Sequence, residues 1–587
     1  MALTVVAFLP ALQGQFLNWD DEKNVVTNEG YRGLGWAQLK WMFTTTLMGH
    51  WIPLTWLTLG VNYVLGGMVP WGYHLGNLLL HAANAVVFYA VARRLLAAGS
   101  GAERTQGAVT WGAVTAAAVF AVHPLRVESV AWVTERRDVL SGFFFLLAVL
   151  SYLNAVERGA GGRLDSRWRA ASLGLFAAAL LSKASTMMLP AALLVLDVYP
   201  LRRRRVGFAV LLREKIGYFA LAGVGAVVAL VAVRQGATVT GYAEYGVGAR
   251  GAMTLYSLLF YPWKFLWPVD LSPMYELPVR VEPLAWRFLL PMVAVPAVTA
   301  ALILLRRRWP GGLAAWVYSA LLVLPVSGAV HAGFQLAHDR YSYLSGLGFA
   351  VLAGAAVVWV IRAGARRVLR PWLEGVVLGA VVLVVATLAA GSWRQSRVWQ
   401  DSESLWSWAV GVDPACALCS NNLGQALIMA HSTSPGHVRL AEGYFRFAMS
   451  QRPRQPDAYH NLGAALAMQG RFDEAEAALL TYLQLSPPWN PEPPARLGLL
   501  HVDQKRYADA IPLLHRALAL DPRFPLVRQD LVVALRKRAD ELEARGETQE
   551  AAALRREATD LLARDPGGPA RSTVPGPGGG PAAREGR

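Results

Sequence analysis

The sequence predicts an all-α protein in which a bundle of membrane-spanning helices is followed by an α-solenoid of helical repeats. Of the 587 residues, 54% are hydrophobic and only 16% are charged, whereas soluble globular chains contain about 25% charged residues. Apolar stretches separated by short Arg-rich connectors continue to about residue 391, and a polar, charged sequence follows. The two parts of the chain are therefore suited to two different solvents.

About eleven apolar segments are candidates for crossing the membrane, because a helix needs about 20 apolar residues to cross about 30 Å of hydrocarbon. They lie at residues 2–17, 73–92, 108–122, 139–156, 170–182, 185–200, 216–233, 286–305, 313–330, 342–361 and 373–391. The first segment lacks the basic region and the cleavage site of a signal peptide, so it is interpreted as a retained anchor. The aromatic stretch 251–268 is interpreted as interfacial or re-entrant.

Arginine residues in the connectors predict the orientation of the bundle. If the eleven helices alternate in direction, every dense basic cluster falls on one side of the membrane, which is then cytoplasmic. The clusters are Arg93 and Arg94; Arg158, Arg163, Arg167 and Arg169; Arg202 to Arg205; Arg306 to Arg308; and Arg362, Arg366, Arg367 and Arg370. This placement accounts for the net charge of +16 without nucleic-acid binding. An odd number of spans then places the polar C-terminal part outside the cytoplasm.

The polar part contains a repeat with the spacing of tetratricopeptide repeats (TPR). Gly463, Ala475 and Pro487 mark one unit, and Gly498, Ala510 and Pro522 repeat it. Small residues let paired helices approach closely, and each unit must stack on its neighbours to bury its apolar face. A first unit contains an insertion near 433–437, and 525–566 is interpreted as a degenerate fourth unit. The predicted domains are 1–400, with a first extracytoplasmic loop at 18–72; 401–566; and a disordered tail at 567–587.

Only two cysteines occur, Cys416 and Cys419, at the start of the polar part. One pair cannot provide a disulfide framework for the whole fold. A Cys-x-x-Cys pair can form a redox disulfide or supply half of a metal site, but no second pair or nearby histidine cluster completes either one. The pair is interpreted first as structural, and the other two roles stay open.

Four groups of charged residues fall beside the membrane on the side with few other charges. They are Asp20 with Asp21; His123, Arg126, Glu128, Arg136, Arg137 and Asp138; Lys183; and His338, Asp339 and Arg340. A charge near hydrocarbon is costly and tends to mark a functional site. A carboxylate can act as a general base toward a hydroxyl group, and cations can hold an anionic leaving group such as a phosphate. If the groups share one cavity, they suit group transfer from a lipid phosphate.

Each group also has a structural explanation. Asp20 and Asp21 could cap a helix N-terminus, and Arg126 with Glu128 could form an interfacial ion pair. Lys183 could extend to the lipid headgroups. The residues alone therefore indicate a charged extracytoplasmic cavity and no particular reaction.

Seven motifs add a resemblance to a known family. They are FLNWDD at 16–21, WIPLTWL at 51–57, YHLGNLLLHAAN at 73–84, HPLRVESVAWVTERRDVL at 123–140, SKASTMMLP at 182–190, LDVYPL at 196–201 and DRYSYL at 339–344. Together they resemble a family of bacterial membrane proteins with TPR tails. That family is similar to the eukaryotic transmembrane and TPR-containing O-mannosyltransferases of the GT-C glycosyltransferase superfamily. The resemblance covers nearly the whole chain, and HPLRVESVAW is a long and specific part of it.

The resemblance implies a GT-C-like membrane domain that takes a sugar from a polyprenyl phosphate and transfers it to an acceptor on the extracytoplasmic face. Asp20 and Asp21 match the acidic pair of the first external loop, so Asp20 is expected to act as the base and Asp21 to orient the acceptor or donor. Four cations are expected to contact the donor phosphate: Arg126, Arg137, Lys183 and Arg340. Four residues are expected to support them: His123, Glu128, His338 and Asp339.

No metal and no cofactor are expected, because donors with a single phosphate generally need none in this superfamily. One departure from the family pattern lies at Ser182-Lys183-Ala184, where the eukaryotic branch has Ser-Lys-Glu. The change removes one acidic group, which leaves the acceptor and donor open.

The expected partners are a polyprenyl-phosphate-linked sugar, the lipid bilayer and an acceptor polypeptide in the TPR groove, with no nucleic acid. The expected location is a bacterial inner membrane with the TPR domain on the periplasmic side. Three alternatives stay open. The protein could glycosylate a lipid or an envelope polysaccharide, it could be a non-catalytic TPR membrane scaffold, or it could be a transporter, although no pair of broken-helix repeats supports the last.

Overall fold

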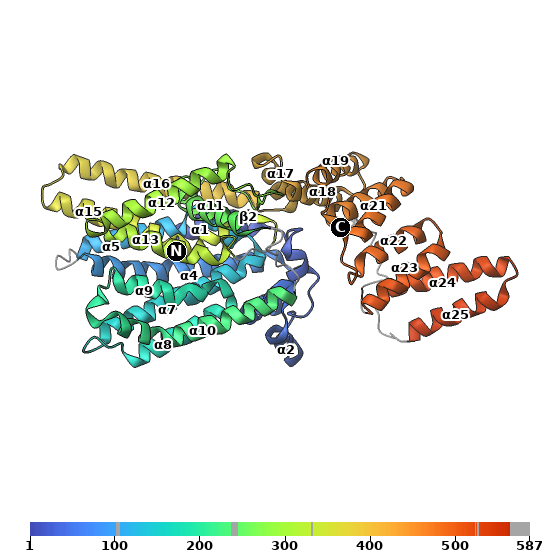
Figure 1. Ribbon diagram of the computed structural model, residues 1–587, viewed down its shortest axis with the longest axis horizontal. Coiled ribbons are helices and arrows are strands. Elements are labelled where there is room, and N and C mark those ends of the chain that lie inside the picture. Colours follow the sequence, from blue (N-terminus) through green and yellow to red (C-terminus); the bar gives the residue numbers. More distant parts are fainter. Residues whose placement is uncertain (101–105, 236–244, 330–332, 523, 525–526, 564–587) are drawn as a thin grey trace, which may run out of the picture. The chain divides into compact units, whose positions relative to one another are not determined.

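The computed structural model describes the chain except residues 101–105, 236–244, 330–332, 523, 525–526 and 564–587. It forms two compact units, Met1–Val412 and Asp413–Arg587 (Figure 1). The predicted boundary at residue 400 lies earlier, because helix α17 (Ser402–Val412) packs on the first unit. The Nε1 atom of Trp406 donates a hydrogen bond to Asn18 Oδ1 at 2.7 Å, and Asn18 N donates to Ser402 Oγ at 2.8 Å. The predicted tail at 567–587 lies outside the described residues.

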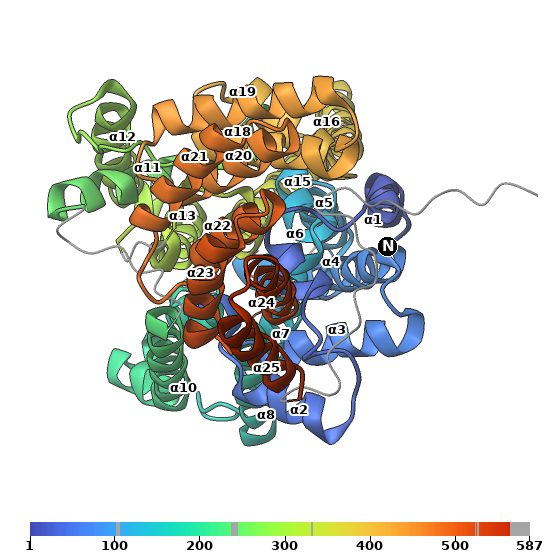
Figure 2. The same ribbon diagram turned by 90° about the vertical axis from the view of Figure 1, so that its right-hand side faces the viewer.

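The first unit is built from long apolar helices that run side by side along one direction (Figure 1) and are seen more nearly end-on after a 90° turn (Figure 2). Among the described residues, six helices are long and apolar enough to cross a membrane. They are α4 (Pro70–Gly99), α7 (Arg136–Arg158), α10 (Phe208–Gln235), α12 (Trp286–Leu304), α15 (Leu347–Ala365) and α16 (Pro371–Val398). A seventh span is reached if α5 (Gln106–Ala121) and the following segment Pro124–Ala131, bent by 56°, count as one.

The predicted number of eleven spans is therefore not shown. Three of the expected segments contain only shorter apolar helices, Ala2–Gln13, Ala184–Val198 and Pro310–Val326. Each contains a proline, which removes a backbone donor and restricts the helix at that point. The expected span at 170–182 corresponds to α8 (Ser166–Ser182), whose 17 residues include Arg167 and Arg169.

The remaining elements of the first unit are short or lie between the long helices. The helices are α1 (Ala2–Phe8), α2 (Trp36–Thr44), α3 (Pro53–Gly66), α6 (Val127–Ala131), α9 (Leu189–Val198), α11 (Val247–Leu266), α13 (Pro310–Val323) and α14 (Ser342–Ser345). Two strands, β1 (Tyr275–Glu276) and β2 (Gln335–Ala337), pair antiparallel. The described residues are thus almost entirely helical or irregular. Helix α11 covers the aromatic stretch 251–268 and is not among the six candidate spans.

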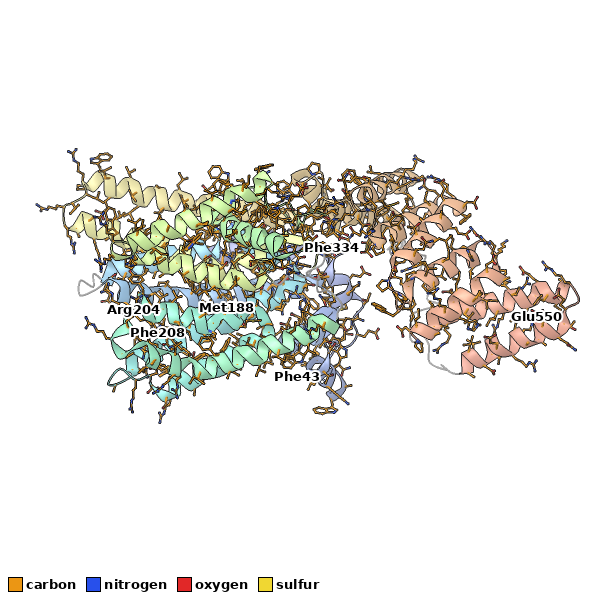
Figure 3. The ribbon with its side chains drawn as sticks, in the orientation of Figure 1. Phe43, Met188, Arg204, Phe208, Phe334 and Glu550 are labelled. Carbon is orange, nitrogen blue, oxygen red and sulfur yellow. A yellow bond between two sulfur atoms is a disulfide. The ribbon has the colours of Figure 1, made fainter. Side chains whose placement is uncertain are left out.

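The two ends of the first unit differ in character. Arg204 and Phe208 lie at one end, and Phe43 and Phe334 lie at the other (Figure 3). The first end, called the basic end, collects the arginines of the connectors: Arg94 approaches Glu157, and Arg362 Nη1 donates to the carbonyl of Ser100. The second end, called the site end, contains the loop after α1.

The second unit is a stack of paired helices. They are α18 (Ala417–His431), α19 (Pro435–Gln451), α20 (Pro456–Met468), α21 (Phe472–Leu485), α22 (Glu492–Asp503), α23 (Tyr507–Leu520), α24 (Val527–Ala544) and α25 (Thr548–Ala563). A Cβ atom on Gly463 would lie 2.8 Å from Leu479 Cγ, and one on Gly498 would lie 2.8 Å from Leu514 Cδ2. The repeated glycine is therefore required by the close approach of the partner helix in each pair.

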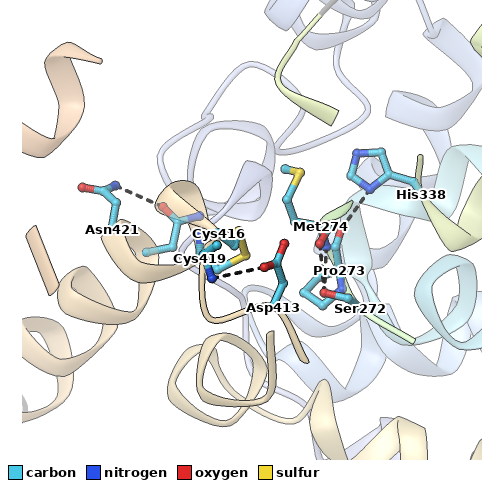
Figure 4. The surroundings of a disulfide bond; sticks show 10 residues. Ser272, Pro273, Met274, His338, Asp413, Cys416, Cys419 and Asn421 are labelled. Atoms are coloured by element: carbon cyan, nitrogen blue, oxygen red, sulfur yellow. Dashed lines mark hydrogen bonds between the residues drawn. A yellow bond between two sulfur atoms is a disulfide. The ribbon is translucent and has the colours of Figure 1, made fainter. Parts of the chain in front are cut away.

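Cys416 and Cys419 form a disulfide at the start of α18 (Figure 4). Cys416 is the N-cap residue of this helix, and its Sγ atom accepts a hydrogen bond from Cys419 N at 3.1 Å. Both side chains are buried. The two cysteines are therefore joined in a disulfide within one helical turn, which is one of the roles that the sequence leaves open.

Close packing of α5 against α15 provides a test of the bundle. A Cβ atom on Gly112 would lie 2.6 Å from the Gly354 carbonyl oxygen, and one on Gly354 would meet the Gly112 carbonyl oxygen. Small residues at such crossings let helices approach in a membrane. We expect Gly112→Ala and Gly354→Ala to lower the free energy of unfolding by about 1–3 kcal/mol, measured as a lower thermal midpoint in detergent. Gly379→Ala, where nothing lies within 4 Å, should leave the midpoint equal or higher. Equal midpoints for all three variants would contradict this packing.

Candidate active site

Asp21 anchors the loop that follows the first helix. Its carboxylate is fully buried and accepts three hydrogen bonds: from Leu17 N at 3.1 Å, from Thr134 N at 2.9 Å and from Thr134 Oγ1 at 2.6 Å. Burial raises the pKa of Asp21 to about 6, although the hydrogen bonds from Thr134 and Leu17 lower it. Since all its contacts are within the protein, Asp21 ties the loop to the turn that precedes α7.

Asp20, its neighbour, is placed quite differently. Its side chain is half-buried, and within the described part of the chain its carboxylate has no hydrogen bond or ion pair. Burial raises the pKa of Asp20, whereas the charges of Arg137 and Arg340 lower it. Trp19, the residue before it, stacks on Trp132 with ring centroids 4.3 Å apart. The loop is thus held firmly on both sides of a carboxylate that is still able to accept a proton.

Glu135 is the centre of the charged site. Its side chain is 0% exposed and contacts three cations: Arg137 Nη2 at 2.6 Å, Lys183 Nζ at 2.9 Å and Arg340 Nε at 3.2 Å. Lys183 Nζ also contacts Asp138 Oδ1 at 2.6 Å. A buried charge of this kind is tolerated only when it is paired and hydrogen-bonded. Glu135 therefore gathers cations from three separate elements at one point.

Arg340 carries the network toward Glu128. The two side chains form an ion pair, and Glu128 Oε2 also accepts a hydrogen bond from Arg340 N at 2.8 Å. His338 Nδ1 donates to the Pro273 carbonyl at 2.8 Å (Figure 4), and burial with the Arg340 charge holds its pKa well below the ordinary value. Asp339 Oδ1 accepts a hydrogen bond from Tyr275 at 3.0 Å. These residues surround Arg340 and fix its position.

Arg126 and His123 lie apart from this network. Arg126 is fully buried between the rings of Phe120 and Tyr343, and its Nη1 atom donates to Ser342 Oγ at 3.1 Å. Among the described residues its Nε and Nη2 atoms have no hydrogen-bond partner. His123 stacks on Phe265 and contacts the carbonyl of that residue at 2.9 Å. Neither residue lines the cavity that contains Arg137 and Lys183.

That cavity, called the α8–α10 cavity, has a volume of about 230 Å³. Its polar part is formed by His50, Arg137 and Lys183, and its wall is apolar. The wall includes Ala177, Leu180 and Leu181 from α8 and Leu221, Val224 and Val228 from α10. An apolar slot that ends at clustered cations suits an amphipathic anion with a long hydrocarbon chain.

The structure brings together most, but not all, of the residues that the sequence singles out. Three cations meet at Glu135: Arg137, Lys183 and Arg340. The charges of Arg137 and Arg340 also lower the pKa of Asp20. Arg340 is surrounded by Glu128, His338 and Asp339. Glu135 and His50 are not among the residues that the sequence singles out. Glu135 lies within the specific motif at 123–140, next to the selected arginines, so the motif contained the signal. No local pattern marks His50, which reaches the cavity only through the fold.

No group of three or more His, Cys, Asp or Glu side chains is arranged to hold a metal ion in the part of the chain that the structure describes. The acidic side chains of the site contact arginine and lysine instead. The carboxylates of the site are thus paired with arginine and lysine side chains.

The amino-acid sequence is similar to those of a group of transferases. The chain is homologous to proteins named protein O-mannosyl-transferase: it is 26% identical to TMTC3 of Mus musculus over 545 residues, which cover 83% of this chain and 55% of that protein. It is 26% identical to TMTC1 of Homo sapiens over 513 residues, 77% of this chain and 54% of that protein. A shorter match of 159 residues, 38% identical, is found with Tmtc2 of Drosophila melanogaster and covers 26% of this chain and 15% of that protein. The chain therefore spans about half of the first two relatives.

Residues 456–489 match the family model described as tetratricopeptide repeat. This match lies on α20 and α21 and confirms the repeat that the sequence predicts. Among solved structures, MamA is 18% identical, with 28% of this chain and 88% of that chain covered and a TM-score of 0.23. The TPR protein YrrB is 14% identical, with 27% and 94% covered and a TM-score of 0.22.

The raised pKa of Asp21 predicts how stability depends on pH. A carboxyl group with a higher pKa in the folded than in the unfolded state contributes stability that is complete below its unfolded pKa, near 3.8, and is lost as the pH rises through about 6. Asparagine does not titrate. We therefore expect Asp21→Asn to lower the unfolding temperature, relative to wild type, more at pH 4 than at pH 7. The loss of unfolding free energy that the substitution causes should differ between the two pH values by at most about 3 kcal/mol.

Thermal unfolding in detergent at a series of pH values measures this effect. Glu29→Gln is the matched control, because Glu29 lies in the same loop and is exposed, with only a 3.8 Å approach to Arg32. If Asp21→Asn lowers the unfolding temperature by the same amount at every pH from 4 to 7, the pKa of Asp21 is not raised.

Proposed function

We propose that this protein is a membrane glycosyltransferase that moves a sugar from a polyprenyl-phosphate-linked donor to a hydroxyl group of a protein, as a mannosyltransferase does. The observation that carries the proposal is that Asp20 lies within electrostatic range of Arg137 and Arg340, and that Arg137, with Lys183, lines the end of an apolar slot. Homology to proteins named protein O-mannosyl-transferase supports the same reaction class. The reaction, the donor and the acceptor are proposed together, because each needs the same site.

The α8–α10 cavity is the proposed donor site. Arg137 and Lys183 would hold the phosphate, with His50 at the same end, and the apolar wall from α8 and α10 would hold the first isoprene units. Arginine and lysine bind phosphate through charge-assisted hydrogen bonds. Glu135 and Asp138 position these cations and partly offset their mutual repulsion, so that their charge becomes available to the anion without a large rearrangement.

Asp20 is the proposed general base. It accepts the proton of the acceptor hydroxyl as the hydroxyl oxygen forms a bond to C1 of the sugar, and the bond from C1 to the phosphate oxygen breaks. The electron pair of that bond leaves with the polyprenyl phosphate, whose negative charge Arg137 and Lys183 stabilise. Arg340 acts on Asp20 through its charge, which favours the ionised form. Asp21 positions the loop, and we assign it no contact with the reacting atoms.

Arg126 takes a different role in this proposal from the one its motif suggests. Its guanidinium packs between Phe120 and Tyr343 and bonds Ser342, which precedes α15. We propose that it positions the segment carrying Asp339 and Arg340, and that His123 stabilises the bend after α5. The donor phosphate is thereby left to the cations at Glu135.

The proposed orientation places the site end outside the cytoplasm and the basic end inside it. The shorter apolar helices together with α8 would bring the number of crossings to about eleven. The disulfide between Cys416 and Cys419 supports an oxidising compartment for the second unit. In a bacterial inner membrane this compartment is the periplasm, where the TPR groove would bind the acceptor polypeptide and raise its local concentration.

One observation also favours a non-catalytic scaffold as the second candidate. Glu128, Glu135 and Asp138 are all locked in ion pairs with cations, as expected of a purely structural network. Asp20 differs from them, since among the described residues its carboxylate has neither an ion pair nor a hydrogen bond, so the two functions make opposite predictions for this residue. A transferase needs its carboxylate, and a scaffold does not.

Substitution of Asp20 separates them. We expect Asp20→Asn to reduce sugar transfer by roughly 10²- to 10⁴-fold, with little change in the thermal midpoint, because the side chain is half-buried and makes no hydrogen bond to any residue that the structure describes. The assay uses the full chain in nanodiscs, labelled polyprenyl-phosphate-mannose and a Ser/Thr-rich peptide, with release of polyprenyl phosphate as a second readout. Glu29→Gln should retain wild-type activity. A folded Asp20→Asn protein with undiminished transfer would exclude Asp20 as the base, and transfer to lipid but not peptide would favour a glycolipid acceptor.

The pH profile tests the electrostatic role of the cations. Because Asp20 must be ionised to accept a proton, activity should fall on the acidic side as the pH drops through its raised pKa. Arg137 lowers that pKa, so Arg137→Gln should shift the acidic limb of kcat, measured at saturating donor, to higher pH. Lys23 acts in the same direction with a smaller effect, and Lys23→Gln should give a smaller shift. An acidic limb that does not move in either variant would contradict this assignment.

A further inference from the structure

A second cavity lies in the membrane unit and is larger than the proposed donor site. Its volume is about 520 Å³, within the range of about 300–1,000 Å³ that is typical of ligand pockets. It is bounded by α4, α7, α9, α13 and α15, and no residue lines both this cavity and the α8–α10 cavity. The two spaces are therefore separate.

Small side chains create this space between helices that otherwise pack closely. Gly311, Ala314, Gly348 and Ala355 line it together with larger apolar residues. Ala314 and Ala355 are only half-buried although they lie within the bundle, because their side chains face the cavity. The wall thus offers an apolar channel with room for a hydrocarbon chain.

The composition of the lining changes at the basic end of the unit. Arg362, in the last turn of α15, and Arg366, the residue that follows this helix, line the cavity there, beside Tyr199 and Ser100. Arg362 is half-buried, and Arg366 is exposed. Arg362 Nη1 donates to the Ser100 carbonyl at 3.3 Å, which places the arginine across the ends of α4 and α15. Two cations therefore stand at one end of an apolar channel.

We propose that this cavity binds an anionic phospholipid, with one acyl chain in the channel and the phosphate at Arg362 and Arg366. Complementary charge identifies the headgroup as anionic, since basic pockets between membrane helices bind such lipids. The apolar lining from Phe88, Leu95 and Leu352 identifies the rest of the molecule as hydrocarbon. The occupant is a structural bilayer lipid, distinct from the sugar donor, and the inference does not depend on the proposed function.

Native mass spectrometry of the delipidated full chain tests the proposal. We titrate dioleoyl phosphatidylglycerol and, separately, dioleoyl phosphatidylcholine. The expected result is one tightly bound phosphatidylglycerol, with at least tenfold weaker binding of phosphatidylcholine. The double variant Arg362→Gln/Arg366→Gln should weaken phosphatidylglycerol binding at least tenfold, and Ala355→Phe should block it by filling the channel.

Matched controls lie on the same helix and the connector that follows it. Arg367→Gln/Arg370→Gln removes two charges that do not line the cavity, and Ala356→Phe adds a ring on the exposed face of α15. Both should bind as wild type. If the double arginine variant does not fold, Arg366→Gln alone serves, because that side chain is exposed. Equal binding of the two lipids, or equal loss in the controls, would overturn the proposal, as would one-for-one displacement of phosphatidylglycerol by polyprenyl phosphate.

Discussion

The charged site depends on one buried carboxylate, that of Glu135. Arg137, Lys183 and Arg340 come from three elements that are distant in the sequence, and their charges would repel one another if no anion lay between them. Glu135 contacts all three, so that the α7 end, the turn after α8 and the segment before α14 converge at one point. Removing one partner from a buried charge network is usually far more damaging than removing an exposed pair. The geometry of the proposed donor site therefore depends on a residue that need not touch the donor.

Two adjacent acids in the first loop illustrate how position decides chemistry. Asp21 is buried and accepts hydrogen bonds from Leu17 and Thr134, which use its acceptor capacity within the protein. Asp20 is half-buried; burial raises its pKa, and the charges of Arg137 and Arg340 lower it in part. One aspartate fixes the loop and the other remains available to a substrate. Two adjacent acids of one motif thus have different surroundings, and only Asp20 is the proposed base.

The sequence could predict the helical class, the repeat and most of the charged cluster, because each depends on local features. The glycine spacing of the repeats follows from close contacts within each helix pair. The structure confirms that Gly463 and Gly498 are packing positions. The number of spans could not be predicted, because proline-containing segments such as Pro310–Val326 are apolar but short. The separation of Arg126 from Arg137 also could not be predicted. Both lie in one motif, but the backbone is extended at Trp132, between α6 and α7, and the two side chains enter different environments.

The contact between α17 and the loop after α1 has a mechanical consequence. Asn18 forms hydrogen bonds with Ser402 and Trp406, and Trp406 also packs edge-on against Trp19. Residues 413–416 separate α17 from the first helix of the repeat array, and Asn18 lies two residues before Asp20 in the chain. A displacement of α17 would therefore shift the loop that carries the Asp20 carboxylate.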